Sequence, residues 1–514
     1  MHLLRKVPIA LTALLMLAPI IAVVLAPLHT PAPEWDFVRS ALLPGHLIET
    51  ARLVLVSALL AIVLGSSTAW LVTSARFPGR DLFRWALMLP LALPTYIGSI
   101  TFAALLGPTG SLSRMLRSST GIGIDILTPD GLAITFGLLL YPYVYLPARA
   151  VFSNGMSDLL EAARTLGASP ARRARRVAFP MARPAIAGGA LLVAMEALND
   201  YGAVQYYGVH TLTAGLFKAW GGLYDTGSAL RIAGILLLIV LVLAWGEERS
   251  RGRASRTSTS PPLRPARLHG WRALTASIWC TLVLGIAFVL PFGTLVIDTV
   301  QVAGTTVWSE LTGPLLNTLK LAGGSALLTL LIALLFAFAQ RNGQARLVKL
   351  TSIGYAVPGA VIAMGVMGLA GTFADRTQWI LIGTVPLVMY AFAVRFLAMA
   401  TNPLNAGLAT QPRTLDDSAR LLGASRIRTF LHINLPLLRP SLVAASAIVL
   451  IEVMKELPLT LILRPFGMDT LSTHVFYMAR IEQWREAAPP ALLIVLCSLL
   501  PVLLLERWLQ PGRK

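Results

Sequence analysis

The sequence predicts an all-α integral membrane protein with about twelve transmembrane helices, arranged as two parallel six-helix repeats. Of the 514 residues, 56% are hydrophobic and only 13% are charged, and the mean hydropathy is +0.71. Soluble proteins carry about 25% charged residues. Apolar runs of about 20 residues recur along the chain, and each is long enough to cross a hydrocarbon layer about 30 Å thick. Runs of this length cross as helices, because a helix satisfies its backbone hydrogen bonds internally.

Six apolar runs are expected in each half of the chain. In the first half they cover about 8–27, 50–74, 84–107, 131–150, 184–204 and 229–246. In the second half they cover about 273–297, 315–339, 349–371, 378–400, 440–460 and 489–508. The first run has an alternative interpretation as a signal peptide. Its length and the lack of a clear small-residue cleavage site favour a retained helix.

The net charge is +19, and basic residues gather in alternate loops between the spans. This is the pattern of the positive-inside rule, which places those loops in the cytoplasm. Arg5 and Lys6 before the first span, and Arg513 and Lys514 after the last, put both termini there. Nucleic acid is excluded as a partner, since aromatic and basic residues do not interleave.

Residues 249–271 are rich in Arg, Ser and Pro and nearly lack aliphatic side chains. Such a segment cannot bury a core and is typical of a linker. We therefore predict a first six-helix repeat at 1–248, a basic cytoplasmic linker at 249–271, and a second six-helix repeat at 272–514.

The two halves are copies of one another. Glu49 begins a segment, ETARLVLVSAL, that aligns with NTLKLAGGSAL from Asn317. Further on, EAARTLGAS from Glu161 aligns with DSARLLGAS from Asp417. Two repeats of the same topology predict a pseudo-twofold axis along the membrane normal.

The loop between the fourth and fifth spans of the first half predicts a helix–glycine–helix hairpin. Asp158 followed by Glu161 matches a capping box that would start a short helix. Gly167 is a typical C-terminal stop. Ser169 followed by Pro170 then restarts a helix, with the serine as its N-cap and the proline in its first turn.

The second half repeats this plan. Thr414 and Asp417 supply the expected cap, Gly423 the stop, Ser425 the restart and Pro436 the exit. One interpretation is that these basic loops rest on anionic lipid headgroups. It does not explain why an acidic residue, a small residue and a glycine recur at fixed spacing in both halves. The spacing therefore favours a docking element for another protein.

These loops resemble the signature of the membrane subunit of binding-protein-dependent ABC importers, which reads EAA, three residues, G, and a later proline. The first loop matches it at Glu161, Ala162, Ala163, Gly167 and Pro180. The second departs from it, because Asp417 replaces the glutamate and Ser418 the first alanine, while Ala419, Gly423 and Pro436 match. The departure leaves open whether the two loops dock equally tightly.

The resemblance covers nearly the whole chain and implies the type I ABC importer permease fold. In this family the loop forms a coupling helix seated in a cleft of the ATPase. The resemblance thus assigns docking to Glu161, Ala162, Ala163 and Gly167 in one loop, and to Asp417, Ala419 and Gly423 in the other. It implies two copies of a cytoplasmic ATPase, a periplasmic binding protein, and a place in the bacterial inner membrane.

No cofactor is expected on this chain, since the Gly-Lys pair of a phosphate-binding loop is absent from the sequence. ATP and Mg²⁺ would bind to the partner ATPase. Segments that start at Ala197 and Glu452 are most similar to ferric-iron permeases, which makes ferric iron the first candidate substrate. Thiamine and phosphonate permeases are the alternatives. The seven histidines show no metal-ligand spacing, so no metal site is expected.

Charged side chains within spans are costly and are functional candidates. A matching group stands in the fifth span of each half: Glu196, Asn199 and Asp200, and Glu452, Lys455 and Glu456. One interpretation is a translocation pathway or gate lined by carboxylates that attract a cation. The other is helix packing, with Lys455 or Arg395 neutralising Glu452. Both remain open from the sequence.

Three tyrosines in the fourth span, Tyr141, Tyr143 and Tyr145, are interpreted as packing residues, since a spacing of two places them on different helix faces. Two other functions compete with the importer. A secondary transporter can also hold two six-helix repeats, but it needs no docking hairpin repeated between spans. A membrane enzyme would need a catalytic cluster of His, Cys or carboxylates, which the sequence lacks.

Overall fold

The computed structural model describes residues 2–28, 34–121, 123, 125–153, 156–254, 263, 265–304, 308–343, 354 and 356–509. Side chains are described from residue 7 onward, and not for 251–254 or from residue 500 on. Most of the predicted linker, 255–262 with 264, lies outside the described residues. So do the start of the predicted span 349–371 and the terminal Arg513 and Lys514.

The described residues are almost entirely helical, which confirms the all-α prediction. Within the described part of the chain, eight helices are long and apolar enough to cross a membrane, or up to ten if each of two bent pairs counts as one span. One bent pair joins Arg80–Ala92 to Thr95–Thr120 at 94°, and the other joins Arg426–Leu437 to Arg439–Lys455 at 74°. The remaining two predicted spans, 349–371 and 489–508, overlap α19 (Gly359–Thr377) and α27 (Ala488–Leu509), neither of which is among these spans.

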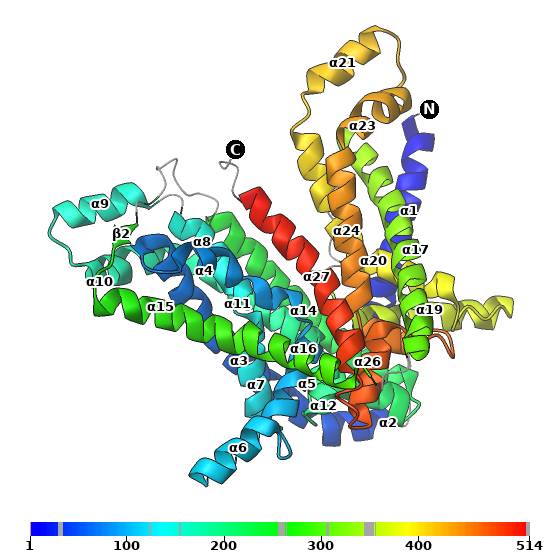
Figure 1. Cartoon of the computed structure of the whole chain (residues 1–514). Helices are drawn as coiled ribbons and strands as arrows, with labels where there is room; N and C mark the ends of the chain where they lie inside the picture. Colours follow the sequence, from blue (N-terminus) through cyan, green and yellow to red (C-terminus); the bar gives the residue numbers. More distant parts are fainter. Residues whose placement is uncertain are drawn as a thin grey trace. The chain divides into compact units, whose positions relative to one another are not determined.

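The chain folds into two compact units. One unit combines residues 1–36, 216–237 and 307–474. Its helices (Figure 1) are α1 (His2–Leu25), α2 (Glu34–Phe37), the start of α14 (Thr226–Ala254), α17 (Trp308–Arg341), α19, α20 (Val385–Ala409), α21 (Arg413–Leu421), α22 (Arg426–Thr429), α23 (Leu435–Leu437), α24 (Arg439–Lys455), α25 (Pro458–Leu463) and the start of α26 (Leu471–Arg480). We call it the second-repeat unit, since most of it comes from the second half.

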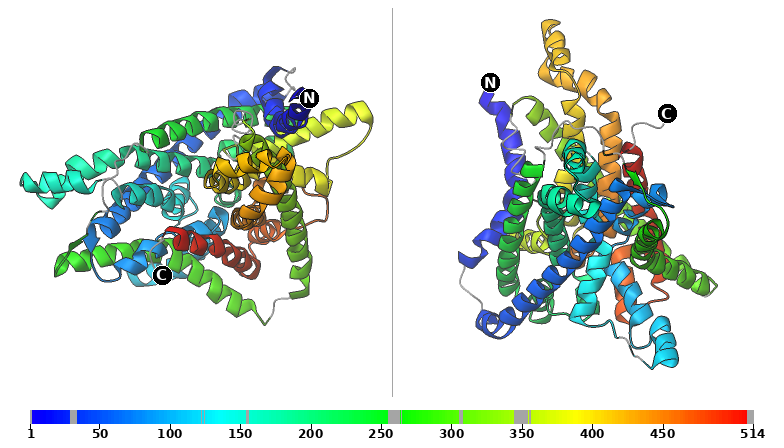
Figure 2. Two further views of the ribbon diagram at one scale, coloured as in Figure 1. Left: turned by 90° about the horizontal axis from the view of Figure 1, so that it is seen from above. Right: turned by 90° about the vertical axis from the view of Figure 1, so that its left-hand side faces the viewer.

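The first-repeat unit combines residues 37–215, 238–306 and 475–514. Its elements are α3 (Leu43–Ser74), β1 (Ala75–Arg76), α4 (Arg80–Ala86), α5 (Thr95–Leu106), α6 (Ser111–Thr120), α7 (Pro129–Leu140), α8 (Pro142–Ser153), α9 (Ser157–Thr165), α10 (Pro170–Arg173), α11 (Phe179–Asn199), α12 (Gly202–Tyr206), α13 (Leu212–Phe217), the rest of α14, β2 (Ala266–Arg267), α15 (Trp271–Leu284), α16 (Leu290–Val302) and α27. Helix α6 stands away from the other helices of this unit (Figures 1 and 2).

Each unit takes its core from one half of the chain and includes helices from the other half. In the second-repeat unit, α1 packs along α19, and Gly365 of α19 meets the backbone of Pro19 so closely that no side chain would fit. In the first-repeat unit, α15 packs on α3 and α4, and α16 packs on α27. The compact units thus cross the predicted boundaries at 248 and 272, which describe the sequence duplication.

Packing within each unit follows the same plan. Helix α3 packs against α7, α8 and α11, while α17 packs against α20 and α24. These are the second, fourth and fifth spans of each half. Their buried faces carry small residues, which let the helix backbones approach closely in a bilayer. Gly65 of α3 illustrates this, since a side chain there would collide with the backbone of Tyr141 and Tyr145.

The end of the predicted linker is ordered against the first-repeat unit. Strand β2 pairs in parallel with β1, at the end of α3, in a ladder two residues long. Leu263 N donates to the carbonyl of Ser153, the last residue of α8, over 3.1 Å. The start of the predicted linker also differs from expectation, because α14 continues as helix to Ala254.

Candidate functional site

The loop after α8 forms the predicted helix–glycine–helix hairpin, which we call the first hairpin (α9 and α10). Gly167 has a φ of 77°, a left-handed conformation that favours glycine. Its N–H donates to the carbonyl of Arg164 over 3.0 Å, and Ala168 N donates to Ala163 O over 3.0 Å. This is a Schellman C-cap. Ser169 Oγ then accepts from Arg172 N and starts α10.

The second hairpin (α21 and α22) has the same geometry at the aligned positions of the second half. Gly423 has a φ of 81° and donates to Arg420 O over 2.9 Å. Ala424 N donates to Ala419 O over 2.9 Å, and Ser425 Oγ accepts from Arg428 N. A π-helical turn follows each hairpin, at Ala174–Ala178 and at the aligned Phe430–Asn434. The predicted stops and restarts are therefore confirmed.

The predicted helix starts are wrong. Helix α9 begins after Met156 and α21 after Pro412, and neither start has a side-chain cap. The carboxylate of Asp158 instead accepts from Ser157 Oγ over 3.2 Å. Glu161 and Asp417 lie near basic residues one turn on, with Arg164 and Arg420 nitrogens at 3.9 Å in both hairpins. The acidic side chains therefore lie outside any capping box.

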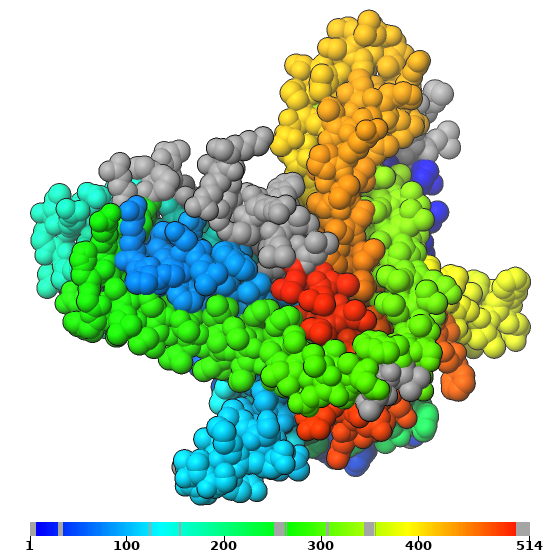
Figure 3. Space-filling view, in the orientation of Figure 1, coloured from blue at the N-terminus to red at the C-terminus, as the bar shows by residue number. Residues whose placement is uncertain are grey.

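Both hairpins expose acidic and apolar side chains together. The side chains of Glu161 and Asp417 are 67% and 66% exposed. The leucine before each glycine is also exposed: Leu166 is 87% exposed and Leu422 is 89% exposed. The second hairpin stands clear of the rest of its unit, beyond the end of α24 (Figure 3). The tip of each turn therefore presents a large apolar side chain close to an exposed acidic one.

The small residues of the signature are placed unequally. Ala162 is exposed, Ala163 is partly buried, and Ala419 is only 6% exposed. Ala419 therefore packs against its own hairpin and unit. The exposed leucines were missed from the sequence because leucine is common in every part of this chain. Their recurrence directly before the glycine of each hairpin, within otherwise polar loops, is the signal that would have found them.

The polar residues predicted at the end of α11 lie close together, where this helix breaks. Asp200 accepts from Ala203 N over 2.8 Å and so caps α12, and Thr95 Oγ1 also donates to its carboxylate. Glu196, half-buried one turn earlier, accepts from the phenol of Tyr143 over 3.1 Å. Asn199 lies beside them and is partly buried.

The matching group in the second-repeat unit is joined by ion pairs. Lys455 Nζ lies 2.7 Å from Glu452 Oε1, with both side chains about three-quarters buried. Glu456 caps α25 by accepting from Leu459 N over 3.0 Å, and Arg395 Nη1 lies 3.4 Å from its other oxygen. Gly359 packs against this Arg395–Glu456 pair with no room for a side chain.

Asp200 and Glu456, which align between the two halves, therefore perform the same structural task of capping the helix after the break. Glu196 and Glu452 are more exposed than the two caps. Assignment of all six residues to a pathway stays a prediction.

A pair of threonines, one in each unit, holds the first residue of the next helix, α13 in one unit and α26 in the other. Thr50 Oγ1 accepts from Leu212 N over 2.9 Å, and Thr318 Oγ1 accepts from Leu471 N over 2.8 Å. Both threonines are at most 5% exposed. The first contact lies beside His46 and His210, whose rings are 5.8 Å apart. The sequence did not predict that these histidines meet, because they belong to segments far apart in the chain.

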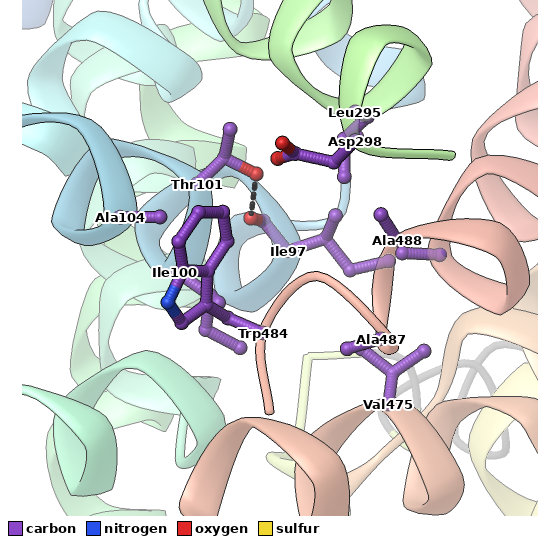
Figure 4. A pocket seen from close by; sticks show the side chains of 11 residues that line it. Ile97, Ile100, Thr101, Ala104, Leu295, Asp298, Val475, Trp484, Ala487 and Ala488 are labelled. Atoms are coloured by element: carbon purple, nitrogen blue, oxygen red, sulfur yellow. Dashed lines mark hydrogen bonds between the residues drawn. The ribbon is translucent and has the colours of Figure 1, made fainter. Parts of the chain in front are cut away.

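The first-repeat unit also holds an open hollow of about 300 Å³ between α5, α16 and the start of α27. Its walls are mostly apolar, and Asp298, which is 7% exposed, is the charged residue among those that line it (Figure 4). Thr101 beside it donates to Ile97 O over 2.8 Å. Among the described residues, no group of three or more His, Cys, Asp or Glu side chains is arranged to hold a metal ion.

These features define a duplicated helical membrane protein with one exposed helix–glycine–helix hairpin in each repeat. The sequence matches the family described as "Binding-protein-dependent transport system inner membrane component" over residues 61–245 and 329–514, one match in each half. The chain belongs to this family. It is a permease subunit of a binding-protein-dependent ABC importer, a multi-pass membrane protein and not an enzyme.

Curated relatives match at different lengths. The Fe(3+)-transport system permease protein FbpB 2 of Haemophilus influenzae is 28% identical over 464 residues, which cover 87% of both chains. The ferric transport system permease protein FbpB of Actinobacillus pleuropneumoniae is 24% identical over 77% of this chain and 61% of its own length. A probable sulfate transport system permease protein, cysT of Chlorokybus atmophyticus, is 33% identical over 48% of this chain and 88% of its own.

Among solved structures, a chain of a bacterial alginate ABC transporter is similar to 47% of this chain and 96% of that chain, at 17% identity and a TM-score of 0.37.

Proposed function

We propose that this permease imports ferric iron delivered by a periplasmic binding protein. The observation that supports iron is the length of the match to FbpB 2, which includes both repeats and 87% of each chain. The sulfate permease cysT, in contrast, aligns with about half of this chain. The binding protein would capture the substrate before it reaches this chain.

The two hairpins would each dock on one copy of a cytoplasmic ABC ATPase. Leu166 and Leu422 would enter apolar clefts of the ATPase, and the carboxylates of Glu161 and Asp417 would meet basic groups at the rim. Support comes from the identical C-caps, which fix the angle of each helix, and from the matching exposure of the side chains. ATP and Mg²⁺ would be held by the ATPase, and this chain would carry no cofactor.

Orientation follows from the same assignment. The hairpins and the linker would lie on the cytoplasmic side of the inner membrane, together with both termini. The binding protein would dock on the opposite, periplasmic side. ATP-driven closure of the ATPase pair would move both hairpins, and each would carry its fifth span with it. Glu196 and Glu452 lie on those spans, so a pathway lined by these carboxylates would change with the same motion.

Uptake by cells that lack this chain, complemented with wild-type or variant genes, tests the proposal. We expect wild-type cells to accumulate ⁵⁵Fe(III), and the double variant Gly167→Pro with Gly423→Pro to lose ATP-dependent uptake while it remains in the membrane. Proline holds φ near −65° and cannot adopt the left-handed turn. Gly121, at the C-terminus of α6, also has a left-handed φ, of 73°, and its N–H donates to the Arg117 carbonyl of its own helix, so Gly121→Pro is the control.

Sulfate is the second candidate, because the cysT relatives match a half of the chain at up to 33% identity. The same cells should therefore be supplied with ³⁵S-sulfate, thiamine and a phosphonate. Uptake of iron alone would support the proposal. Uptake of sulfate without iron would contradict it, and would assign the half-buried carboxylates a packing role, since they would repel an oxyanion.

A further inference from the structure

The two hairpins are joined to their units by different interactions. At the base of the second hairpin, Arg341 ends α17 and reaches across to the segment between α20 and α21. Its Nε donates to Asp416 Oδ2 over 2.7 Å, and Nη1 donates to the carbonyls of Leu408 and Gln411 over 3.0 and 3.1 Å. Its Nη2 donates to Pro412 O over 3.2 Å. All three guanidinium nitrogens are thus used.

The carboxylate of Asp416 extends this contact to the other side of the hairpin. Asn434 Nδ2 donates to Asp416 Oδ1 over 3.1 Å and to Gln411 Oε1 over 3.0 Å. Gln411 Nε2 in turn donates to Asn434 O over 3.3 Å. The side chains of Arg341 and Asp416 are only 9% and 10% exposed. We call Arg341, Asp416, Asn434 and Gln411 the hairpin lock.

The first hairpin carries apolar residues at the matching positions. Leu160 stands in the place of Asp416, and Ala178 in the place of Asn434, and both are buried. Thr73, the counterpart of Arg341, donates only to carbonyls of its own helix. The base of this hairpin is a cluster of three rings from α3, α8 and α11: Trp70, Phe152 and Phe179, with centroids 5.3 to 6.1 Å apart. The second hairpin has one ring pair at its base, Phe338 and Phe430 with centroids 5.3 Å apart, in addition to the hairpin lock.

These two kinds of base constrain motion differently. A guanidinium has a planar, fixed fork of donors, so four simultaneous hydrogen bonds fix both the position and the angle of the segment they hold. Aromatic rings attract one another over a range of offsets and tilts, so a small rotation costs little. The second hairpin should therefore move together with α17 and α20 as one rigid body. The first hairpin should be able to tilt by a small angle against its aromatic cluster.

The geometry points to Arg341 and Asp416 as positioning residues that make the second hairpin the rigid one of the two couplings. This inference rests on the proposed docking of both hairpins on ATPase subunits. In the assembled importer, movement of the ATPase would pass directly into α17 and α20 through the hairpin lock. Loss of the lock would lower transport per ATP hydrolysed on the order of fivefold, the lower end of typical coupling between sites.

Spin labels on matched positions test the inference on the full chain in lipid nanodiscs. Thr414→Cys on α21 and Asp158→Cys on α9 are exposed and occupy aligned positions of the two hairpins. Both labels are placed in a background where Cys280→Ala and Cys497→Ser remove the two native thiols. The variants are Arg341→Met, Asp416→Leu and the double variant. The leucine at position 416 is the residue that the first hairpin has at the matching position, Leu160.

We expect each single variant to lower the thermal unfolding temperature, because it leaves a buried charge without its partner, and the double variant to recover much of it. The α21 label should become more mobile in all three variants, the double included, while the α9 label should not change. Unchanged α21 mobility would overturn the inference. So would a double variant whose α21 label is as immobile as in the wild type, since the lock would then act on stability alone.

Label mobility is measured without any ATPase, so it separates the inference from the proposed function. If the α21 label becomes more mobile in the variants and the chain also transports without an ATPase, the docking proposal is contradicted. The inference about the hairpin lock would still stand. If the mobility of the α9 label increases as much as that of the α21 label, the inference about the hairpin lock is overturned. The variants would then have relaxed the whole chain. In the complete importer, transport per ATP should fall in the double variant in spite of its restored unfolding temperature.

Discussion

Lys455 Nζ lies 2.7 Å from Glu452 Oε1, within one turn of α24. In the first repeat the position of Lys455 is taken by Asn199, and Glu196 accepts a hydrogen bond from the Tyr143 phenol. The two halves of a duplicated membrane protein have thus kept a carboxylate at the same place in the fifth span and given it different partners. A cation that passes along these spans would meet one carboxylate beside a lysine and another beside a phenol.

The first prediction separates charge from packing at these carboxylates. Glu196→Gln keeps an oxygen that accepts from Tyr143, so we expect its thermal stability to stay within about 0.5 kcal/mol of the wild type. If Glu196 attracts a cation, iron uptake should nevertheless fall several-fold. Unfolding temperature and ⁵⁵Fe uptake are measured on the same preparation to check this. Unchanged uptake would mean that Glu196 has a packing role only.

Glu452→Gln should behave differently, because it leaves the partly buried Lys455 without its ion pair. We expect a loss of about 1 kcal/mol in stability. Combining it with Lys455→Met should restore stability, because the double variant leaves no half-buried charge unpaired. Thermal unfolding of the two single variants and the double variant completes this cycle. A loss in the double variant equal to the sum of the two single losses would show that the pair is not coupled.

A second prediction concerns the glycine turns of the hairpins. A Cβ at Gly167, Gly423 or Gly121 would meet no atom within 4 Å, so alanine there adds only the strain of a left-handed backbone, about 1 kcal/mol. The three alanine variants should therefore lose similar thermal stability. Only Gly167→Ala and Gly423→Ala should also lower ATP-driven uptake. An equal effect of Gly121→Ala on uptake would contradict a special role for the hairpins.

A third prediction uses the duplicated threonines. Thr50→Val and Thr318→Val keep the shape of the side chain but remove the acceptor of a buried backbone N–H, of Leu212 and of Leu471 respectively. An unsatisfied buried donor costs about 1–3 kcal/mol. We expect comparable losses in thermal stability for the two variants, and a smaller loss for Thr→Ser at each position. A loss at one site alone would show that the starts of α13 and α26 are not held equally in the two units.

A fourth prediction concerns pH. Burial alone would raise the pKa of Asp416, but hydrogen bonds from Arg341 and Asn434 and the nearby arginine charges hold the pKa below its ordinary value. Asp416 in the folded chain therefore contributes stability that is present above about pH 4, its unfolded pKa. That stability is lost as the pH falls through the lower, folded pKa.

The difference in unfolding temperature between the wild type and Asp416→Asn should thus shrink as the pH is lowered from 6 to 3. Asp417→Asn, on the exposed face of α21, is the control and should show little difference at any pH. A difference between the wild type and Asp416→Asn that stays constant with pH would mean that the carboxylate does not contribute through its charge.

Much of this structure was predictable from local sequence. The hairpins could be predicted, because a glycine stop and a serine restart act over a few residues and occur at aligned positions in both halves. The helix starts were not, since Asp158 and Thr414 match a cap pattern that their backbones do not use. The bend at Pro90–Pro94 was also missed, because the apolar run continues through it.

Contacts between distant segments escaped prediction for a different reason. Arg341 and Asp416 are 75 residues apart, and both look like ordinary charges of basic loops. The packing of α1 on α19 joins the start of the chain to its second half, and no periodicity in either helix reports it. Asp200 and Glu456 were found as intramembrane charges, but their role as caps depends on the break in the helix that follows.

Uptake of ⁵⁵Fe into proteoliposomes tests the account most directly, with this permease reconstituted alone or together with its ATPase and binding protein. The account predicts accumulation only when ATP, the ATPase and the iron-loaded binding protein are all present, and its loss in the Gly167→Pro, Gly423→Pro variant. Accumulation by the permease alone, at the same rate with and without ATPase, would contradict it.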